Sequence, residues 1–297
     1  MTAKILSALS RLPMSVLHVL ATCLGFVAHR VLKYRRQVIR LNIEQSFPNR
    51  PTAWHRNVER NYYKHFADIT MESIKNFSIS NEEAMDRMQH QHVELFKPFF
   101  HSNRSVLIAG GHLNNWELYA VTASQNLDHD VMAVYKKLSD PKMDEAVRSS
   151  RERFGLEMVR TVDSQAWMKT HMGQGKPKAV VMGFDQSPAD PKKSWWNEFL
   201  SQETAWYFGL EKWAHEFNLP VIYGHIYKVG RGKYRTEYEL ITDDPKSLPS
   251  GEILRRCIRS LEIDIQNHPD EWLWSHKRWK HVRPSDAQLN KSALAKN

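Results

Sequence analysis

The sequence predicts an α/β fold in which a mixed central sheet is flanked by helices. From residue 105 onward, short apolar segments of strand length alternate with charged segments of helix length, which is typical of a layered α/β sheet. The segments predicted as crossover-connected strands are 105–109, 131–135 and 179–184. Two later segments, 220–227 and 233–242, flank Gly230-Arg231-Gly232 and predict a hairpin that adds antiparallel strands to the sheet.

Helices are expected between these strands and throughout the N-terminal part. Prolines and polar residues at 47–51 predict a break between two N-terminal helices, and Gly155 stands where a helix is expected to end. The predicted helices cover about 14–28, the stretch from the following basic cluster to Glu44, 54–77, a helix starting near Asn115, 142–154, 206–217 and 251–266.

The N-terminal apolar run from Met14 to Ala28 predicts a membrane-binding helix. Lys4 and Arg11 precede it, but it offers no small-residue cleavage site, so we interpret it as an uncleaved helix and not as a signal peptide. It is shorter than the roughly 20 apolar residues that span a bilayer upright. The basic cluster that follows it suits anionic headgroups, which predicts a helix lying in or dipping into the membrane. A buried core helix of a soluble protein is the alternative.

Composition and charge narrow the class of protein. With 41% hydrophobic and 25% charged residues, the chain is expected to fold into a globular protein. A net charge of +9 favours a partner rich in negative charge, such as a nucleic acid, an anionic membrane or an acidic protein. Cys23 and Cys257, far apart in the chain, make a cysteine zinc site or a disulfide framework improbable and fit a reducing compartment.

The expected organisation has three parts. Residues 1–45 form a membrane-associated helical segment, 46–285 form the main domain, and 286–297 form a polar C-terminal tail. A length of 297 residues is enough for one α/β domain with a sizeable core. If the N-terminal helix crossed the membrane, its positive flank would place the main domain in the cytoplasm.

Most familiar catalytic motifs are missing from the sequence. It has no GxSxG elbow, no GxGxxG after a strand and no HExxH, since His215-Glu216 lacks the second histidine. A phosphate loop at Gly173-Gln174-Gly175-Lys176 is excluded because Pro177 stands where that motif requires Ser or Thr. No metal site and no tightly held cofactor are predicted.

The segment that carries candidate chemistry is Gly110-Gly111-His112-Leu113-Asn114-Asn115-Trp116-Glu117, directly after a predicted buried strand. Strand ends in α/β sheets hold reacting groups rigidly and open to a ligand. His112 and Glu117 span a turn and a helix start and can face one another, which would make the imidazole a base able to deprotonate a hydroxyl. The alternative is structural: Asn114 or Asn115 caps the helix and Glu117 stabilises its first turn.

The Gly-His-x-x-x-x-Glu pattern resembles the HX4D/E signature of the glycerophosphate and lysophospholipid acyltransferase superfamily. The chain is more specifically similar to the late acyltransferases of lipid A biosynthesis, over most of its length. The segments that carry this resemblance are Arg36, Arg40, Asn42, Phe47-Pro48, 112–117, Tyr135-Lys136, 151–155, Asp185-Gln186-Ser187-Pro188, the predicted hairpin and Trp274 to Lys280. The chain departs from the family pattern at Lys136-Lys137, where Arg-Pro is common, and at Ala189, where Gly is common.

The resemblance implies roles for seven residues. His112 would deprotonate the acceptor hydroxyl and Glu117 would orient the imidazole, with no covalent intermediate. Arg151 and Arg153 would bind an acceptor phosphate or the developing oxyanion, although solvated surface charges are the alternative. Asp185 would order this network or contact the acceptor, unless it caps a turn. Lys136 keeps the positive charge for anion binding, and Asn115 is expected beside the substrate.

The resemblance also implies the substrates and the location. The acyl donor would be an acyl carrier protein or acyl-CoA, and the expected acceptor is a hydroxyl of a lipid A precursor. A lysophospholipid or aminolipid acceptor is the alternative. The expected location is the cytoplasmic face of the inner membrane.

A nucleic-acid-binding protein is the lesser alternative, since Trp195-Trp196 and the stretch 272–283 join aromatic rings with cations. We instead expect these tryptophans at a membrane interface and predict no nucleic-acid partner, because an apolar helix accompanies them.

Overall fold

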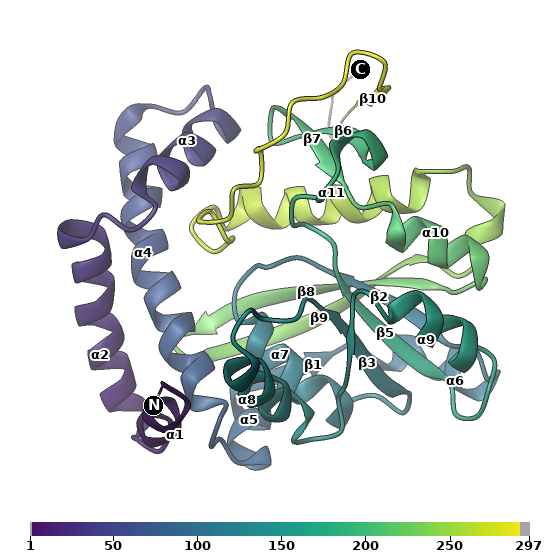
Figure 1. Ribbon diagram of the computed structural model, residues 1–297, viewed down its shortest axis with the longest axis horizontal. Coiled ribbons are helices and arrows are strands. Elements are labelled where there is room, and N and C mark those ends of the chain that lie inside the picture. The colour runs from purple at the N-terminus through teal and green to yellow at the C-terminus, as the bar shows by residue number, and fades with distance from the viewer. Residues whose placement is uncertain (1, 292–297) are drawn as a thin grey trace.

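The computed structural model describes residues 2–291 and centres on a seven-stranded sheet of order β1-β9-β8-β2-β5-β3-β4 (Figure 1). All neighbouring strands are parallel except β8 and β9, which form the predicted antiparallel hairpin. The strands are β1 (Met88–Gln91), β2 (Val106–Gly110), β3 (Asp130–Tyr135), β4 (Glu157–Arg160), β5 (Lys178–Gly183), β8 (Val221–Gly230) and β9 (Lys233–Thr242). The predicted mixed α/β sheet is confirmed, although β1 and β4 were not predicted.

Alternating side chains of β2 reach two different cores. Leu107 and Ala109 belong to one buried cluster, whereas Val106 and Ile108 belong to another. Successive side chains in a strand point to opposite faces of the sheet, so the two clusters lie on its two faces. An uninterrupted apolar strand is therefore expected only where both faces are covered, as they are at this central position.

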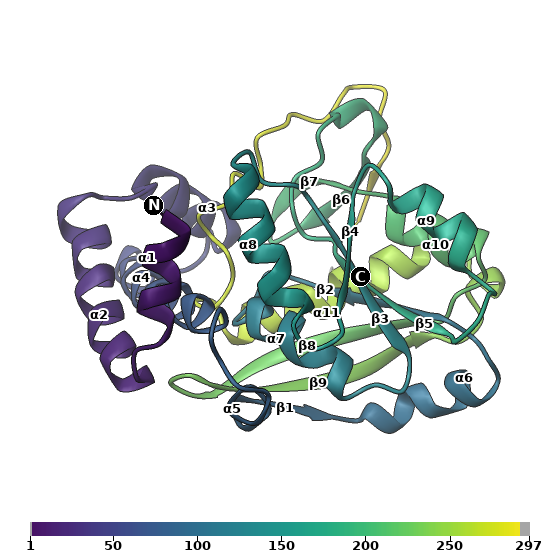
Figure 2. The ribbon, with the colours of Figure 1, turned by 60° about the horizontal axis from the view of Figure 1, so that its bottom comes forward.

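Helices cover both faces of the sheet, as Figures 1 and 2 show. Residues of α10 and α11 join the cluster of Leu107, and residues of α5 and α7 join the cluster of Val106. The main helices are α1 (Thr2–Ser10), α2 (Met14–Phe26), α3 (Arg36–Ser46), α4 (Thr52–Lys75), α5 (Asn81–Arg87), α6 (Lys97–His101), α7 (Trp116–Thr122), α8 (Pro141–Glu152), α9 (Ser164–His171), α10 (Gly209–Glu216) and α11 (Glu252–Asn267).

A small second sheet, which was not predicted, follows β5 in the chain. It has the order β10-β6-β7, with β6 (Trp195–Phe199) and β7 (Gln202–Trp206) antiparallel and β10 (Leu289–Asn290) parallel to β6. The predicted interfacial position of the tryptophans is wrong for Trp196, Trp272 and Trp274, each at most 2% exposed. Packing inside the protein accounts for the presence of these three tryptophans.

The N-terminal helices form a layer at one side of the molecule (purple in Figure 1), where α2 packs along α4. Close packing depends on Gly25, because a Cβ there would lie 3.1 Å from the carbonyl oxygen of Tyr63. The helical run continues through a π-turn to Val31, and Met14–Val31 is long and apolar enough to cross a membrane. Only 17% of that window is buried, so the alternative of a buried core helix is not what the structure shows.

Candidate active site

His112 follows the end of β2 in a loop that closely approaches two other segments. A Cβ on Gly111 would lie 2.5 Å from Cδ1 of Leu261 and 3.3 Å from Oδ2 of Asp185. A Cβ on Gly183 would lie 3.0 Å from Cε1 of His112. Both glycines therefore make room for the imidazole and its neighbours.

Asp185 is the carboxylate partner of His112. Its Oδ1 lies 2.6 Å from Nδ1 of the imidazole, and its Oδ2 accepts hydrogen bonds from the backbone N–H of His112 (2.7 Å) and from Nε1 of Trp272 (2.8 Å). β2 and β5 are neighbouring parallel strands, so the residues that follow them meet at one edge of the sheet. This arrangement fixes the ring, with Nδ1 protonated and Nε2 available as a base.

The electrostatics of this pair favour an ionised carboxylate. Burial alone would raise the pKa of Asp185, but the charge of His112 and three hydrogen bonds lower it to about 2. Burial also disfavours the imidazolium form of His112, yet the Asp185 carboxylate outweighs burial and raises the pKa of His112 above its ordinary value. A more basic imidazole is a stronger proton acceptor once it is neutral.

The second ring nitrogen faces a different environment. Nε2 of His112 lies 3.1 Å from the side-chain nitrogen of Gln186, which can donate to it when Nδ1 carries the proton. The imidazole side chain is 21% exposed, and the Trp116 ring lies edge-on at 5.2 Å between centroids. A hydroxyl that displaces the Gln186 amide would reach Nε2 directly.

The expected pairing of Glu117 with His112 is wrong. Glu117 instead accepts two hydrogen bonds from Arg151, at 2.9 Å from Nε and 2.6 Å from Nη2. It lies in the first turn of α7, which packs against α8. Glu117 still raises the pKa of His112 through space, whereas Arg151 lowers it, so the pair lies within electrostatic reach of the imidazole.

Asn115 has a structural position. Its Oδ1 accepts a hydrogen bond from the backbone N–H of Leu118 at the start of α7, and its amide donates to Oε2 of Glu72 (2.8 Å). The residue has no exposed surface. The capping alternative is therefore confirmed, and the expected substrate contact of Asn115 stays a prediction.

The remaining predicted anion-binding residues are dispersed. Arg153 donates to the carbonyl of Asn76 (3.0 Å), and its guanidinium lies over the Phe154 ring. Lys136 is exposed beyond the end of β3. With Arg151 held by Glu117, none of the three cations contacts His112 or Asp185.

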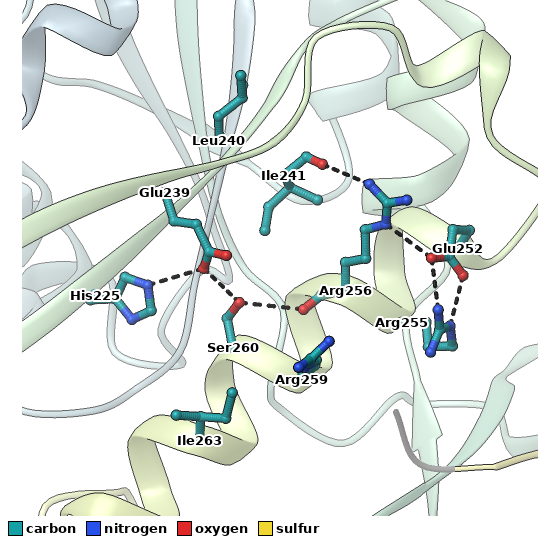
Figure 3. Close-up of a pocket in the computed structure, with 10 residues that line it drawn as sticks. All are labelled: His225, Glu239, Leu240, Ile241, Glu252, Arg255, Arg256, Arg259, Ser260 and Ile263. Carbon is teal, nitrogen blue, oxygen red and sulfur yellow. Dashed lines mark hydrogen bonds and ion pairs between the residues drawn. The ribbon is translucent and has the colours of Figure 1, made fainter. Parts of the chain in front are cut away.

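His112 lines neither of two cavities in the described part of the chain. The first, about 140 Å³, is mostly apolar and adjoins the Glu117–Arg151 pair, with a lining of Leu6, Ile74, Phe77, Val121, Met143 and Val147 among others. The second, about 690 Å³, lies between α11 and the β8–β9 hairpin (Figure 3). Its charged groups pair mainly with one another, including Arg256 with Glu252 and His225 with Glu239.

Sequence reasoning missed Gln186 as a neighbour of His112 and Trp272 as a neighbour of Asp185, and it left the role of Asp185 open. The available signal was the position of Asp185 directly after a predicted strand, since parallel strands end at a common edge. Within residues 2–291, no cluster of three or more metal-ligating side chains is present.

The fold and the site define an α/β protein in which a carboxylate holds an imidazole at the edge of a mixed, mostly parallel sheet. The chain belongs to the bacterial lipid A biosynthesis acyltransferase family, whose model matches residues 1–281. No curated protein matches the chain. Membership indicates acyltransferase activity in lipid A synthesis, with an acyl donor and a lipid acceptor. Members of this family are membrane-associated.

Proposed function

We propose that this protein is an O-acyltransferase that moves a fatty acyl chain from an acyl thioester to a hydroxyl of a lipid A precursor. The observation that carries the proposal is the His112–Asp185 pair, with a 2.6 Å contact at Nδ1, at the end of β2. The family assignment supports the reaction class.

In the proposed mechanism, Asp185 accepts a hydrogen bond from Nδ1–H of His112. The lone pair on Nε2 of His112 is then available for catalysis. Nε2 of His112 removes the acceptor's hydroxyl proton as its oxygen attacks the thioester carbonyl. The tetrahedral oxyanion then collapses, the carbon–sulfur bond breaks, and the thiolate takes the proton from Nε2. The products are an ester and a free thiol, and no acyl-enzyme forms.

The Glu117–Arg151 pair has a supporting role in this proposal. Its two charges act on His112 with opposite signs, so they tune the basicity of the imidazole without touching it. Arg151 is 21% exposed and lines the smaller cavity. An acyl chain bound in that mostly apolar cavity would therefore lie beside the charged pair. Glu117 is thus a positioning residue for the reaction.

The donor is an acyl carrier protein or acyl-CoA, both of which carry the required thioester. A net charge of +9 supports an acidic donor of either kind. A lysophospholipid or an aminolipid is the alternative acceptor, and the lipid profile described below distinguishes them.

We propose that α2 lies on the cytoplasmic face of the inner membrane. Its outer face exposes apolar side chains, including Val19 (64%) and Phe26 (63%). Its inner face is bound to the rest of the protein by polar contacts: His18 pairs with Glu72, and Arg231 donates to Thr22 and to the carbonyl of His18. These contacts support an in-plane helix, because a spanning helix would bring them into hydrocarbon.

Mass spectrometry of total lipids tests the proposed function. Cells that lack the protein and are complemented with the wild type should regain one acyl chain on lipid A, whereas His112→Ala should not restore it. His101→Ala, an exposed histidine on α6, serves as the matched control and should restore it. Unchanged lipid A with altered phospholipids or aminolipids would contradict the proposed acceptor, and full restoration by His112→Ala would contradict the mechanism.

A further inference from the structure

Arg278 is a buried guanidinium without a polar partner. The residue is 2% exposed, and Nε, Nη1 and Nη2 all lack a hydrogen-bond partner among the residues that the structure describes. Its guanidinium lies over the Trp206 ring, whose centroid is 4.3 Å from Cζ. A cation–π contact satisfies the face of a guanidinium, but leaves its in-plane N–H donors unused.

The guanidinium of Arg278 keeps its charge in this setting. Burial lowers its pKa to about 9, which leaves it protonated at neutral pH. The carboxylate that acts on it is Asp185, and that carboxylate already serves His112 and Trp272. An uncompensated buried cation is costly, so a further negative group is required to balance it.

Two other buried donors on adjoining segments are also without partners among residues 2–291. They are Nε1 of Trp206 and the hydroxyl of Ser187. Trp206 underlies the guanidinium of Arg278, and the backbone N–H of Ser187 donates to His276, two residues before Arg278. Unused donors on adjoining segments suit an oxyanion, and a planar guanidinium binds phosphate in a bidentate manner.

This region adjoins the catalytic histidine. Gln186, the neighbour of Ser187, contacts Nε2 of His112, and Asp185 contacts Nδ1. The segments 184–190 and 275–281, which carry Ser187 and Arg278, contain no helix or strand, as is usual for segments that bind ligands. Arg151 and Arg153, the residues expected to bind an anion, are already occupied by Glu117 and by the carbonyl of Asn76.

We propose that Arg278, with Trp206 and Ser187, forms an anion-binding site beside His112 for a phosphate group carried by one of the two substrates. The existence of the site is independent of the proposed function, which supplies only the two sources of phosphate. These are the acceptor lipid and the phosphopantetheine arm of the donor.

Thermal unfolding with added inorganic phosphate tests the site itself. The wild type should gain stability as phosphate is raised at constant ionic strength, since a ligand that binds only the folded state stabilises it. Arg278→Met should lose this gain and be at least as stable as the wild type without phosphate, because it removes an unpaired buried charge. The control is Arg283→Met, which lies close to Arg278 in the sequence and breaks an ion pair with Glu203. This variant should keep the gain in stability with phosphate.

Arg278→Lys retains the charge and replaces the planar guanidinium by an ammonium group. It therefore tests the site even if the methionine variant fails to fold. Its gain in stability with phosphate should be clearly smaller than that of the wild type. A phosphate effect that is missing in the wild type, or equal in the wild type and Arg278→Lys, would overturn the proposal.

Kinetics identify the source of the phosphate. In the wild type, removal of the phosphate from the relevant substrate should lower kcat/KM by about 10- to 100-fold, whereas Arg278→Met should be nearly indifferent to it. The pairs to compare are acyl-phosphopantetheine with acyl-pantetheine, and a phosphorylated acceptor with its dephosphorylated form. The contrary result is that, for both substrates, removal of the phosphate lowers kcat/KM by the same factor in the wild type and in Arg278→Met. That result would show that the site does not bind a substrate phosphate, and the inference would fail. Because phosphate binding is measured without turnover, it can succeed even where the proposed acyl transfer is wrong.

Discussion

Two of the histidine–carboxylate clusters in this molecule, those of His112 and His225, have opposite properties. His112 contacts one carboxylate through Nδ1, and its Nε2 faces only the amide of Gln186. His225, on β8, lies between two carboxylates, with Nδ1 2.9 Å from Asp264 and Nε2 3.2 Å from Glu239. Both nitrogens of His225 therefore act as donors, and its ring is the centre of an ion-pair network.

The pKa values follow this difference. Burial would lower the pKa of His225, but hydrogen bonds to Asp264 and Glu239 raise it to about 9, so the ring stays protonated at neutral pH. A protonated ring cannot accept a proton. A histidine beside a carboxylate is thus a candidate base only when its second nitrogen is free of another anion, and His112 meets that condition.

Removing each imidazole should separate the two roles. His112→Ala should lower kcat/KM by about 10²- to 10⁴-fold, the usual worth of a positioned base. His225→Ala should leave Asp264 and Glu239 without their cation and lower the free energy of unfolding by about 3 kcal/mol, while the folded enzyme keeps its activity. Steady-state kinetics and urea unfolding measure both. Loss of catalysis in the His225 variant at full stability would break the comparison.

Asp185→Asn should be the next largest effect, at about 10²-fold or more in kcat/KM, because an amide does not hold the imidazole in the required tautomer. The pH profile provides an independent measurement. Activity requires neutral His112 and should rise with pH through its pKa, which the Asp185 carboxylate raises. Loss of that carboxylate should move the acidic limb of the profile to lower pH. An acidic limb that stays in place would show that Asp185 does not act on the base.

Stability should depend on pH through His225. Its folded pKa of about 9 exceeds the ordinary 6.5, so its contribution is fully present below pH 6.5 and is lost as pH rises to about 9. The difference corresponds to about 3 kcal/mol. Urea unfolding at pH 6 and pH 9.5 should show this loss in the wild type and not in His225→Gln. Equal pH dependence in both proteins would contradict the paired state of this ring.

The smallest effect is expected at Glu117. Its bidentate pair with Arg151 is partly exposed and acts on His112 only through space, so Glu117→Gln should lower kcat/KM by about tenfold. Glu145→Gln, which breaks the exposed pair with Arg148 on α8, is the matched control and should have no effect. A loss at Glu117 as large as that at Asp185 would restore the partner that sequence reasoning assigned to His112.

Local patterns in the sequence were sufficient for the central strands of the large sheet, although not for β1, β4 or the second sheet. The apolar run at 105–109 predicted β2, the flanked Gly230-Arg231-Gly232 predicted the hairpin, and the Gly-Gly-His block predicted a reactive loop at a strand end. Each of these signals lies within a few residues along the chain, where periodicity and turn chemistry act. The family assignment also came from short segments in a given order.

The tertiary structure alone decided which side chains meet. Asp185 lies 73 residues from His112 and reaches it because β5 pairs with β2. Glu117, five residues away, is drawn to Arg151 instead, since α7 packs against α8. The burial of Trp196 and the unpartnered guanidinium of Arg278 depend on the same long-range packing. Contacts between distant segments are set by which strands and helices become neighbours, and no local spacing in a single sequence encodes that choice.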